Sequence, residues 1–347
     1  MSGGGVPKNL KLTTIVPAFN EADCISETII SLKNQSRPPD DIIVVDDSST
    51  DGTGEIARSL GVKVVRPRRN TGSKAGAQNF GLRYVTTDLT MVLDADTTVA
   101  RNGIAEILKA FALPNTAAAC CYVLPRRVRT LWERGRYIEY LYSFSFYKQV
   151  QDYFGKPLIS SGCLSIYDTK RLRLAGGWST RTMAEDMDLT WTFYQMGYKV
   201  RFVPSALCYP IEPYNFDLMH KQLKRWSAAF LQNVKLHGRG LLDTPFLFTA
   251  MAVSLTDATL GALVYLLALP LMAVFVSPWF LLGYIIDAPI IVVPVLIVAR
   301  RRKEVGKAIA SFPSVFILRF VNGFIFLKAV WFEFIIYRPL TTYEKGH

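Results

Sequence analysis

Residues 41–52 read DIIVVDDSSTDG, and this segment indicates the fold class. Its β-branched run, Ile42 to Val45, is typical of a buried strand in a parallel sheet. Acidic residues follow the run at once, and a helix is expected from Thr53. The arrangement recurs further along the chain, because the apolar run Leu89 to Leu93 ends at Asp94.

Strands and helices alternate on both sides of this stretch. Further strands are expected at 12–18 and 62–65, and helices at 21–34, 53–60, 74–84 and 102–111. Alternation at these lengths predicts an α/β domain built on a mostly parallel, Rossmann-like sheet with right-handed connections. Ligands of such sheets bind at the carboxyl ends of the strands, which is where the acidic residues lie.

The later part of the chain is far more apolar than the first part. The protein has 347 residues, 50% of them apolar, and its mean hydropathy is +0.20. A membrane span takes about 20 apolar residues, and Ala258–Val276 and Pro278–Ala299 are of that size. Phe312–Tyr337 is long enough but charged, which leaves open whether it spans. Leu241–Thr256 is short and is expected to lie in the membrane interface.

We therefore expect a soluble domain followed by interfacial and transmembrane helices. The expected segments are a flexible N-terminus (1–11), the catalytic domain (12–214), interfacial helices (215–256), a region of two or three spans (257–337) and a tail (338–347). Arg300–Lys303 follows the second span and marks a cytosolic loop. Met1–Lys11 lacks the apolar core of a signal peptide, so the catalytic domain is expected in the cytosol, attached to the cell membrane.

Charge and cysteine content narrow the class of protein. The 40 basic and 28 acidic residues give a net charge of +12. No zinc-finger spacing is visible, so a basic protein on anionic lipid that handles a diphosphate fits better than a nucleic-acid binder. The five cysteines are odd in number and form no CxxC pair, which speaks against a disulfide framework or a zinc site.

Three acidic clusters suggest the chemistry. Asp94-Ala95-Asp96 suits a divalent cation that bridges a nucleotide diphosphate, because such ions take one or two carboxylates plus phosphate oxygens. Asp46 and Asp47 could accept hydrogen bonds from a base or ribose, or acids there could cap the next helix. Glu185-Asp186 opens a helix and could simply stabilise its first turn. The functional alternative is a general base for a sugar hydroxyl.

The pentad Gln222-Leu-Lys-Arg225-Trp226 lies on an amphipathic helix expected at 216–234. Its glutamine, arginine and tryptophan share one helix face, because they are three and four residues apart. They offer an amide, a guanidinium for phosphate and an indole for stacking on sugar. An interfacial helix with its tryptophan at the lipid headgroups is the simpler alternative.

Taken together, these motifs resemble glycosyltransferase family 2. The resemblance rests on the run from Ile15 to Glu21, the stretch at 42–52, Lys74-Ala-Gly-Ala and the Asp94-Ala-Asp96 pair. The Glu185-Asp186 pair and the pentad narrow it to membrane-bound members, among them cellulose, chitin, hyaluronan and poly-N-acetylglucosamine synthases. That family implies a GT-A fold, a UDP-sugar donor, and inverting transfer assisted by Mg²⁺ or Mn²⁺.

The same resemblance implies a role for each matching residue. Those expected at the uridine end of the donor are Pro17, Glu21, Asp47 and Lys74. Asp94 is expected at the nucleotide and, with Asp96, at the metal. Asp186 matches the general base. Ser161-Gly162-Cys163 falls where the family positions the acceptor. Gln222 and Arg225 match diphosphate contacts, and Trp226 matches the acceptor platform.

The sequence thus predicts a membrane glycosyltransferase that extends a β-linked polysaccharide. Transfer of a single sugar to a membrane lipid, such as polyprenyl phosphate or a glycolipid, stays open. A non-catalytic membrane adaptor is a more remote alternative. The expected partners are a UDP-sugar, the acceptor and the bilayer but no nucleic acid, and the oligomeric state, a homo-oligomer included, is left open.

Overall fold

The computed structural model describes residues 10–341, so most of the expected N-terminus (1–11) and part of the expected tail (338–347) lie outside the described residues. The chain forms two compact units. The first contains Met1–Arg126 and Gln149–Ile211, and the second contains Arg127–Lys148 and Glu212–His347. The segment 127–148, which was expected within the catalytic domain, therefore groups with the later helices.

An eight-stranded sheet forms the centre of the first unit, in the order β3-β2-β1-β4-β7-β6-β8-β5. The strands are β1 (Leu12–Ala18), β2 (Asp41–Asp46), β3 (Lys63–Val65), β4 (Leu89–Leu93), β5 (Thr98–Val99), β6 (Thr116–Val123), β7 (Leu164–Asp168) and β8 (Lys199–Tyr209). The first four strands are mutually parallel, as are β6 and β8, whereas β7 is antiparallel to β4 and β6 and β5 is antiparallel to β8. The mostly parallel α/β sheet that the sequence predicts is confirmed.

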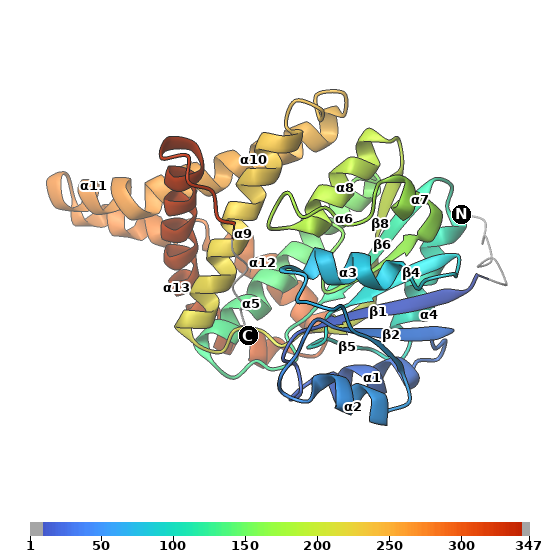
Figure 1. Ribbon diagram of the computed structural model, residues 1–347. Coiled ribbons are helices and arrows are strands. Elements are labelled where there is room, and N and C mark those ends of the chain that lie inside the picture. Colours follow the sequence, from blue (N-terminus) through green and yellow to red (C-terminus); the bar gives the residue numbers. More distant parts are fainter. Residues whose placement is uncertain (1–9, 342–347) are drawn as a thin grey trace. The chain divides into compact units, whose positions relative to one another are not determined.

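The helices of the first unit are α1 (Ile25–Lys33), α2 (Thr53–Ser59), α3 (Lys74–Leu82), α4 (Gly103–Leu108), α6 (Lys148–Tyr153), α7 (Thr169–Leu174) and α8 (Glu185–Gln195). Helix α3 lies on one face of β1 and β2, and α1 and α2 lie on the other (Figure 1). Because helices cover both faces, every residue of β4 and β6 is buried. Gly81 lets α3 approach closely, since a Cβ there would lie 2.8 Å from side-chain atoms of Ile15 and Val45.

The strand register brings three loops to one edge of the sheet. β1, β2 and β4 run parallel, so the segments after Ala18, Asp46 and Leu93 leave at the same edge. β7 runs the other way, and its first residue, Leu164, pairs with Leu93. The three residues before Leu164 therefore lie at that same carboxyl edge, although their sequence carries no strand signal.

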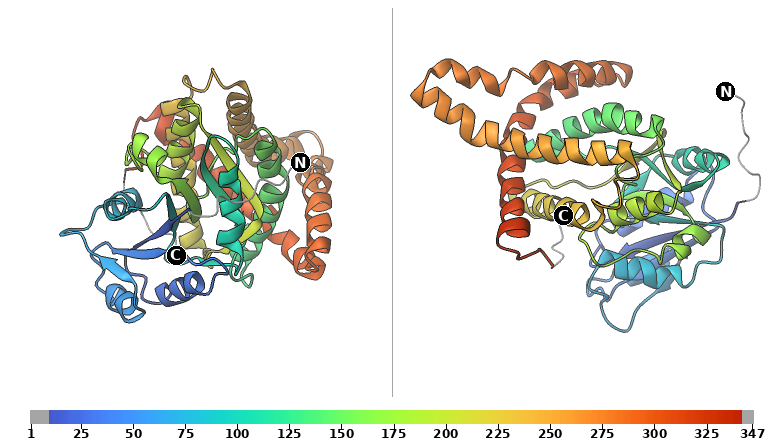
Figure 2. Two further views of the ribbon diagram at one scale, coloured as in Figure 1. Left: turned by 90° about the vertical axis from the view of Figure 1, so that its right-hand side faces the viewer. Right: turned by 90° about the horizontal axis from the view of Figure 1, so that it is seen from above.

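The second unit is helical and contains α5 (Leu131–Tyr142), α9 (Phe216–His237), α10 (Pro245–Leu263), α11 (Leu269–Phe275), α12 (Ala288–Arg301) and α13 (Val305–Val330). Helix α5 begins at a capping box, in which Thr130 accepts from Glu133 N and the Glu133 carboxylate accepts from Thr130 N. Asn215 caps α9 by accepting from Leu218 N at 3.0 Å. Figure 2 shows the long helices of this unit from two further sides.

Three helices of the second unit are long and apolar enough to cross a membrane: Pro245–Phe275, Pro278–Arg301 and Val305–Ile335. The first joins α10 and α11 through a π-helical turn at Val264–Ala268. Residues 245–256, expected as an interfacial segment, thus continue into the first candidate span. The lengths and compositions of the three candidate spans indicate a membrane-associated protein.

Several charged side chains in these helices are paired, which lowers their cost at membrane depth. Arg319 lies 2.9 Å from Asp287 and donates to the Tyr265 hydroxyl at 2.7 Å. Glu333, which is 2% exposed, accepts from Lys235 and Gln232 of α9 at 2.8 Å each. Arg319 and Glu333 therefore cross-link helices of this unit.

Candidate functional site

Lys74, the first residue of α3, brings together three segments at the carboxyl edge of the sheet. Its ammonium group is ion-paired with Asp94, lies 3.7 Å from Glu185 Oε1, and donates to the carbonyl oxygen of Gly162 at 3.0 Å. The Lys74 side chain is 18% exposed, so these contacts are only partly screened by water. The Ser73 hydroxyl accepts from Gly76 N at 3.1 Å, which starts the helix where Lys74 can reach the site.

Gly162 and Asp186 are in direct contact. A Cβ added to Gly162 would lie 2.6 Å from Asp186 Oδ2, closer than real side chains pack. Asp186 Oδ1 accepts from the backbone N–H of Met187 at 2.8 Å, and Asp186 Oδ2 is the atom that faces Gly162. A glycine at this position therefore lets the first turn of α8 approach the loop before β7.

That loop is also tied to the Asp94-Ala95-Asp96 turn. The backbone N–H of Asp94 donates to the carbonyl oxygen of Cys163 at 3.0 Å. Residues 161–163, 94 and 185–186, which the sequence predicts as separate motifs, thus form one connected site in the first unit. Ser161 is buried, whereas Gly162 and Cys163 are half-buried.

The expected metal ligands lie on the turn between β4 and β5. Asp96 is 6% exposed, and its Oδ1 accepts from the Thr97 hydroxyl at 2.9 Å. Thr28 donates to the carbonyl of Ala95 at 2.7 Å, and Arg126 donates to that of Asp96. No group of three or more His, Cys, Asp or Glu residues suited to a metal occurs within residues 10–341. Two carboxylates still suit a magnesium-type ion, because such an ion takes only one or two carboxylates and completes its shell with water or phosphate oxygens.

Asp46 and Asp47 both accept hydrogen bonds from groups of the protein. Asp46 is fully buried, and its two oxygens accept from Ser49 N at 2.9 Å and from Arg66 at 2.8 Å. Asp47 accepts from the backbone N–H and the hydroxyl of Thr71, both at 2.8 Å. These bonds shape the loops around the site, and a direct contact of either acid with a base or ribose stays a prediction.

Glu21 and Pro17 lie at the end of β1. Glu21 is 9% exposed, and its carboxylate accepts from the Cys24 thiol at 3.1 Å. Its backbone N–H donates to the Thr53 hydroxyl at 2.8 Å, which ties it to the start of α2. Helix α1 begins at Ile25, later than the expected Glu21, because Asn20 has a positive φ of 55° and the chain turns first. Pro17, half-buried, pairs with Val45 of β2.

Gln222, Arg225 and Trp226 lie on α9 in the second unit. The expected helix is confirmed and extends to His237. Trp226 is 39% exposed, and Gln222 and Arg225 are half-buried. Gln222 accepts from Arg136 at 2.7 Å, a contact within this unit that the sequence did not predict.

Two further features of the first unit escaped the sequence analysis. Arg181 binds Asp188 through two hydrogen bonds of 2.8 and 2.7 Å, and the bond to Asp188 raises the pKa of Arg181. This pair fixes the loop that leads into Asp186. Three thiols gather behind Gly162, with Cys208 Sγ 3.1 Å from Cys121 Sγ and 3.7 Å from Cys163 Sγ. Burial raises the pKa of Cys208, so it stays protonated.

Tyr167 on β7 lies beneath the acidic pair. Burial, and to a lesser extent the charge of Asp186, raise the pKa of its hydroxyl far above the usual value. Tyr167 therefore stays neutral and packs edge-on against Trp178.

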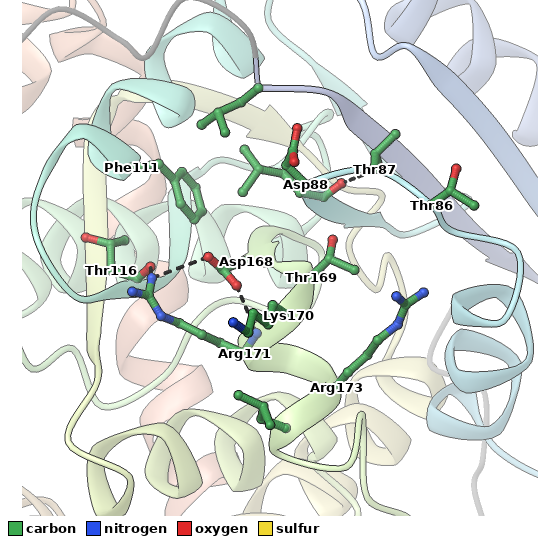
Figure 3. Close-up of a pocket in the computed structure, with 13 residues that line it drawn as sticks. Thr86, Thr87, Asp88, Phe111, Thr116, Asp168, Thr169, Lys170, Arg171 and Arg173 are labelled. Carbon is green, nitrogen blue, oxygen red and sulfur yellow. Dashed lines mark hydrogen bonds and ion pairs between the residues drawn. The ribbon is translucent and has the colours of Figure 1, made fainter.

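A cavity of about 690 Å³ lies at the other edge of the sheet, near the start of β4 and the end of β7. Figure 3 shows Asp168, Lys170, Arg171 and Arg173 on its wall. Arg171 pairs with Asp168 at 3.4 Å, and Arg173 donates to the carbonyl of Val85 at 2.6 Å. The expected site residues lie at the opposite edge of the sheet, so this cavity is separate from them.

Comparisons with known proteins place this site in a family context. Residues 13–172 match the model described as glycosyl transferase family 2. An uncharacterized glycosyltransferase of Escherichia coli, YaiP, is 30% identical over 249 residues, which are 67% of this chain and 60% of the relative. A poly-β-1,6-N-acetyl-D-glucosamine synthase of Staphylococcus epidermidis is 26% identical over 223 residues, 63% of this chain and 54% of the relative. The chain thus spans a little over half the length of these relatives.

Among solved structures, a mannosyltransferase of Pyrobaculum calidifontis in complex with GDP-mannose and Mn²⁺ is similar in fold. Its TM-score is 0.55 at 22% sequence identity, and the match covers 88% of this chain and 87% of that one. The likeness supports the GT-A fold class and carries no statement about the sugar.

Proposed function

We propose that the protein is an integral membrane enzyme of glycosyltransferase family 2 that moves a sugar from a UDP-sugar to a growing β-linked polysaccharide, because residues 13–172 match the model of that family. Transfer is proposed to invert the anomeric centre.

The observation that carries this proposal is the junction at Lys74. One ammonium group holds Asp94, Glu185 and the Gly162 carbonyl together at the edge of the sheet where α/β folds bind ligands. Lys74 offsets the negative charges of Asp94 and Glu185. Without Lys74, these carboxylates would repel an anionic donor. A nucleotide diphosphate would compete for the same ammonium group.

For donor binding, we propose that Pro17, Glu21, Asp46 and Asp47 shape the pocket for the uridine end, with the two aspartates acting partly through the loops they hold. Asp94 and Asp96 would hold Mg²⁺ or Mn²⁺ on the diphosphate. The ion would supply charge stabilisation to the departing UDP. Lys74 would add a fixed positive charge beside the same phosphates.

For the transfer step, we propose Asp186 as the general base and Glu185 as its neighbour that holds Lys74. Asp186 would accept the proton of the acceptor hydroxyl as its oxygen attacks the anomeric carbon. The bond from that carbon to the diphosphate breaks in the same step, and UDP leaves. Ser161, Gly162 and Cys163 would position the acceptor, since Gly162 lies against Asp186 Oδ2.

In the second unit, Gln222 and Arg225 are proposed to contact the diphosphate and Trp226 to stack on the acceptor sugar. The chemical reason is that an amide, a guanidinium and an exposed indole share one face of α9. The proposed location is the cell membrane, with the catalytic unit on the cytosolic side, where nucleotide sugars are made.

This proposal is tested by measuring UDP release by the detergent-purified full chain with Mn²⁺ and a panel of UDP-sugars. The sizes of the products are then determined. Turnover with one donor and a ladder of long products is the expected result. A single sugar added to extracted lipid would replace the polysaccharide acceptor with a membrane lipid. No turnover with any nucleotide sugar and acceptor would contradict the enzymatic assignment and favour a non-catalytic adaptor.

A further inference from the structure

Arg136 of α5 contacts Gln222 and Trp226, two residues of the α9 pentad. Its Nη2 donates to Gln222 Oε1 at 2.7 Å, and its guanidinium carbon lies 4.5 Å from the centre of the Trp226 ring. Both contacts lie within the second unit. Arg136 and Gln222 are 86 positions apart in the sequence, so no local sequence pattern predicts their contact.

The guanidinium is buried and its charge is offset by carboxylates. The Arg136 side chain is 4% exposed, with Glu139 at 2.7 Å and Glu212 at 3.9 Å. Burial alone would lower the pKa of Arg136, but these carboxylates outweigh it and raise the pKa, so the group stays charged. Burying a charge is costly unless it is paired, and a lone packing role would not need one here.

The partners of Arg136 are themselves held in place. Glu139 accepts from Asn322 of α13 at 2.8 Å, and Glu212 accepts from the Tyr140 hydroxyl at 2.8 Å. A guanidinium that is fixed on two sides has little freedom to follow a moving neighbour. Gln222 and Trp226 must instead adopt the orientations that the fixed guanidinium allows.

We propose that Arg136 is a positioning residue that sets the orientation of the Gln222 amide and the Trp226 indole. This inference rests on the proposed function, in which Gln222 contacts the donor diphosphate and Trp226 the acceptor sugar. It adds a residue from a distant helix to that apparatus.

For Gln222, the contact decides which end of the amide faces outward. Arg136 has only donors, so it must take the amide oxygen. The amide nitrogen then lies on the side of Glu212, at 3.5 Å from its Oε2. Because one amide N–H donates to Glu212, a Gln222 held this way has its second N–H rather than its oxygen left to offer, which is what a diphosphate oxygen requires.

For Trp226, the contact fixes the plane of the ring. A guanidinium over one face of an indole is held by the ring quadrupole. The indole is still 39% exposed, so a sugar can stack on the remaining surface. Without Arg136 the ring would be free to rotate away, and the acceptor would lose a preformed platform.

The test uses the full-length protein in detergent with the variants Arg136→Met and Arg136→Lys. Arg134→Met, on the same helix and half-buried, is the matched control. The readouts are the KM for acceptor, kcat, and the thermal unfolding midpoint. Each Arg136 variant is also made in a Trp226→Ala background, which gives a double-mutant cycle.

Arg136→Met is expected to lower kcat/KM for the acceptor on the order of 100-fold, as misplaced groups do. Arg136→Lys keeps the charge but loses the fork and the stacking plane, so it should restore the midpoint and not the acceptor KM. In the Trp226→Ala background, the loss caused by Arg136→Met should largely disappear.

Additive losses in the cycle, or full rescue of acceptor use by Arg136→Lys, would overturn the positioning role. An Arg136→Met protein that matches Arg134→Met in every readout would do the same. If the wild-type protein itself released no UDP from any donor, the proposed function would fail first, and this inference would fall with it.

Discussion

Asp186 Oδ2 occupies the space that a side chain on Gly162 would need, with only 2.6 Å to the position of a Cβ. These two residues belong to the loop before β7 and to the first turn of α8. Their contact brings the proposed general base directly against the segment proposed to hold the acceptor.

Gly162→Ala should therefore displace the Asp186 carboxylate while the sheet beneath it stays folded. We expect a loss of turnover on the order of 100-fold, because a shift of about 1 Å at a reacting group has that effect. UDP release and the thermal midpoint measure the two consequences separately. Gly261→Ala, where nothing lies within 4 Å, is the matched control. Normal turnover by Gly162→Ala would contradict the placement of Asp186.

Lys74→Met should weaken donor binding. The substitution leaves Asp94 and Glu185 without their shared cation, and both would then repel a diphosphate. UDP affinity measured by calorimetry should fall at least about tenfold, equivalent to ~1.4 kcal/mol. The exposed Lys170, at the opposite edge of the sheet, supplies the control Lys170→Met. Equal UDP affinity in both variants would remove Lys74 from the donor site.

Asp96→Ala should abolish the metal dependence of donor binding. Calorimetry with UDP is run with Mn²⁺ and again with a chelator, so that the metal contribution is measured by difference. The wild-type protein should bind UDP more tightly with Mn²⁺, and Asp96→Ala should bind equally in both conditions. Asp168→Ala, at the far edge, should keep the difference. An Asp96→Ala protein that still gained affinity from Mn²⁺ would contradict the metal assignment.

Asp51 gives a prediction about pH. Partial burial alone would raise the pKa of Asp51, but hydrogen bonds from Thr53 and Ala22 outweigh it and lower the pKa below the usual 3.8. A carboxyl with a lower pKa in the folded than in the unfolded chain stabilises the fold above its unfolded pKa, and the stabilisation is lost as the pH falls through the folded pKa.

Asp51→Asn should therefore lower the thermal midpoint at neutral pH. The difference from the wild-type protein should shrink as the pH falls below about 4. Midpoints measured across this range in one detergent give the comparison. A difference that stayed constant over the acid range would show that the Asp51 charge contributes nothing.

The sequence predicted the first half of the sheet well, because its signals are local. β1 and β4 begin and end at the residues that their apolar runs indicate, and α3 starts at Lys74 as expected. The strands after residue 112 were not predicted. β7 contains the polar Ser165 and lies antiparallel between β4 and β6, so its burial depends on distant partners rather than on a local pattern.

The candidate site was predicted as a set of residue types but not as a set of contacts. Asp94 and Asp186 were named from their motifs, whereas the link through Lys74 joins segments 88 residues apart. Arg136 was not predicted, because its helix was expected in the catalytic domain. The importance of Arg136 depends on its contacts with Gln222 and Trp226, which the sequence does not show. Asp46 shows the reverse case: an acid at a strand end, which suggests ligand binding, is fully buried against Ser49 and Arg66.

The most direct test of the account is sugar transfer by Asp186→Asn compared with the wild-type protein. Both proteins are given the donor that the wild type accepts, with Mn²⁺ and acceptor, and labelled product is counted while UDP binding is measured in parallel. The account predicts that Asp186→Asn binds UDP as the wild type does and forms almost no product. Product formation at the wild-type rate by Asp186→Asn would contradict it.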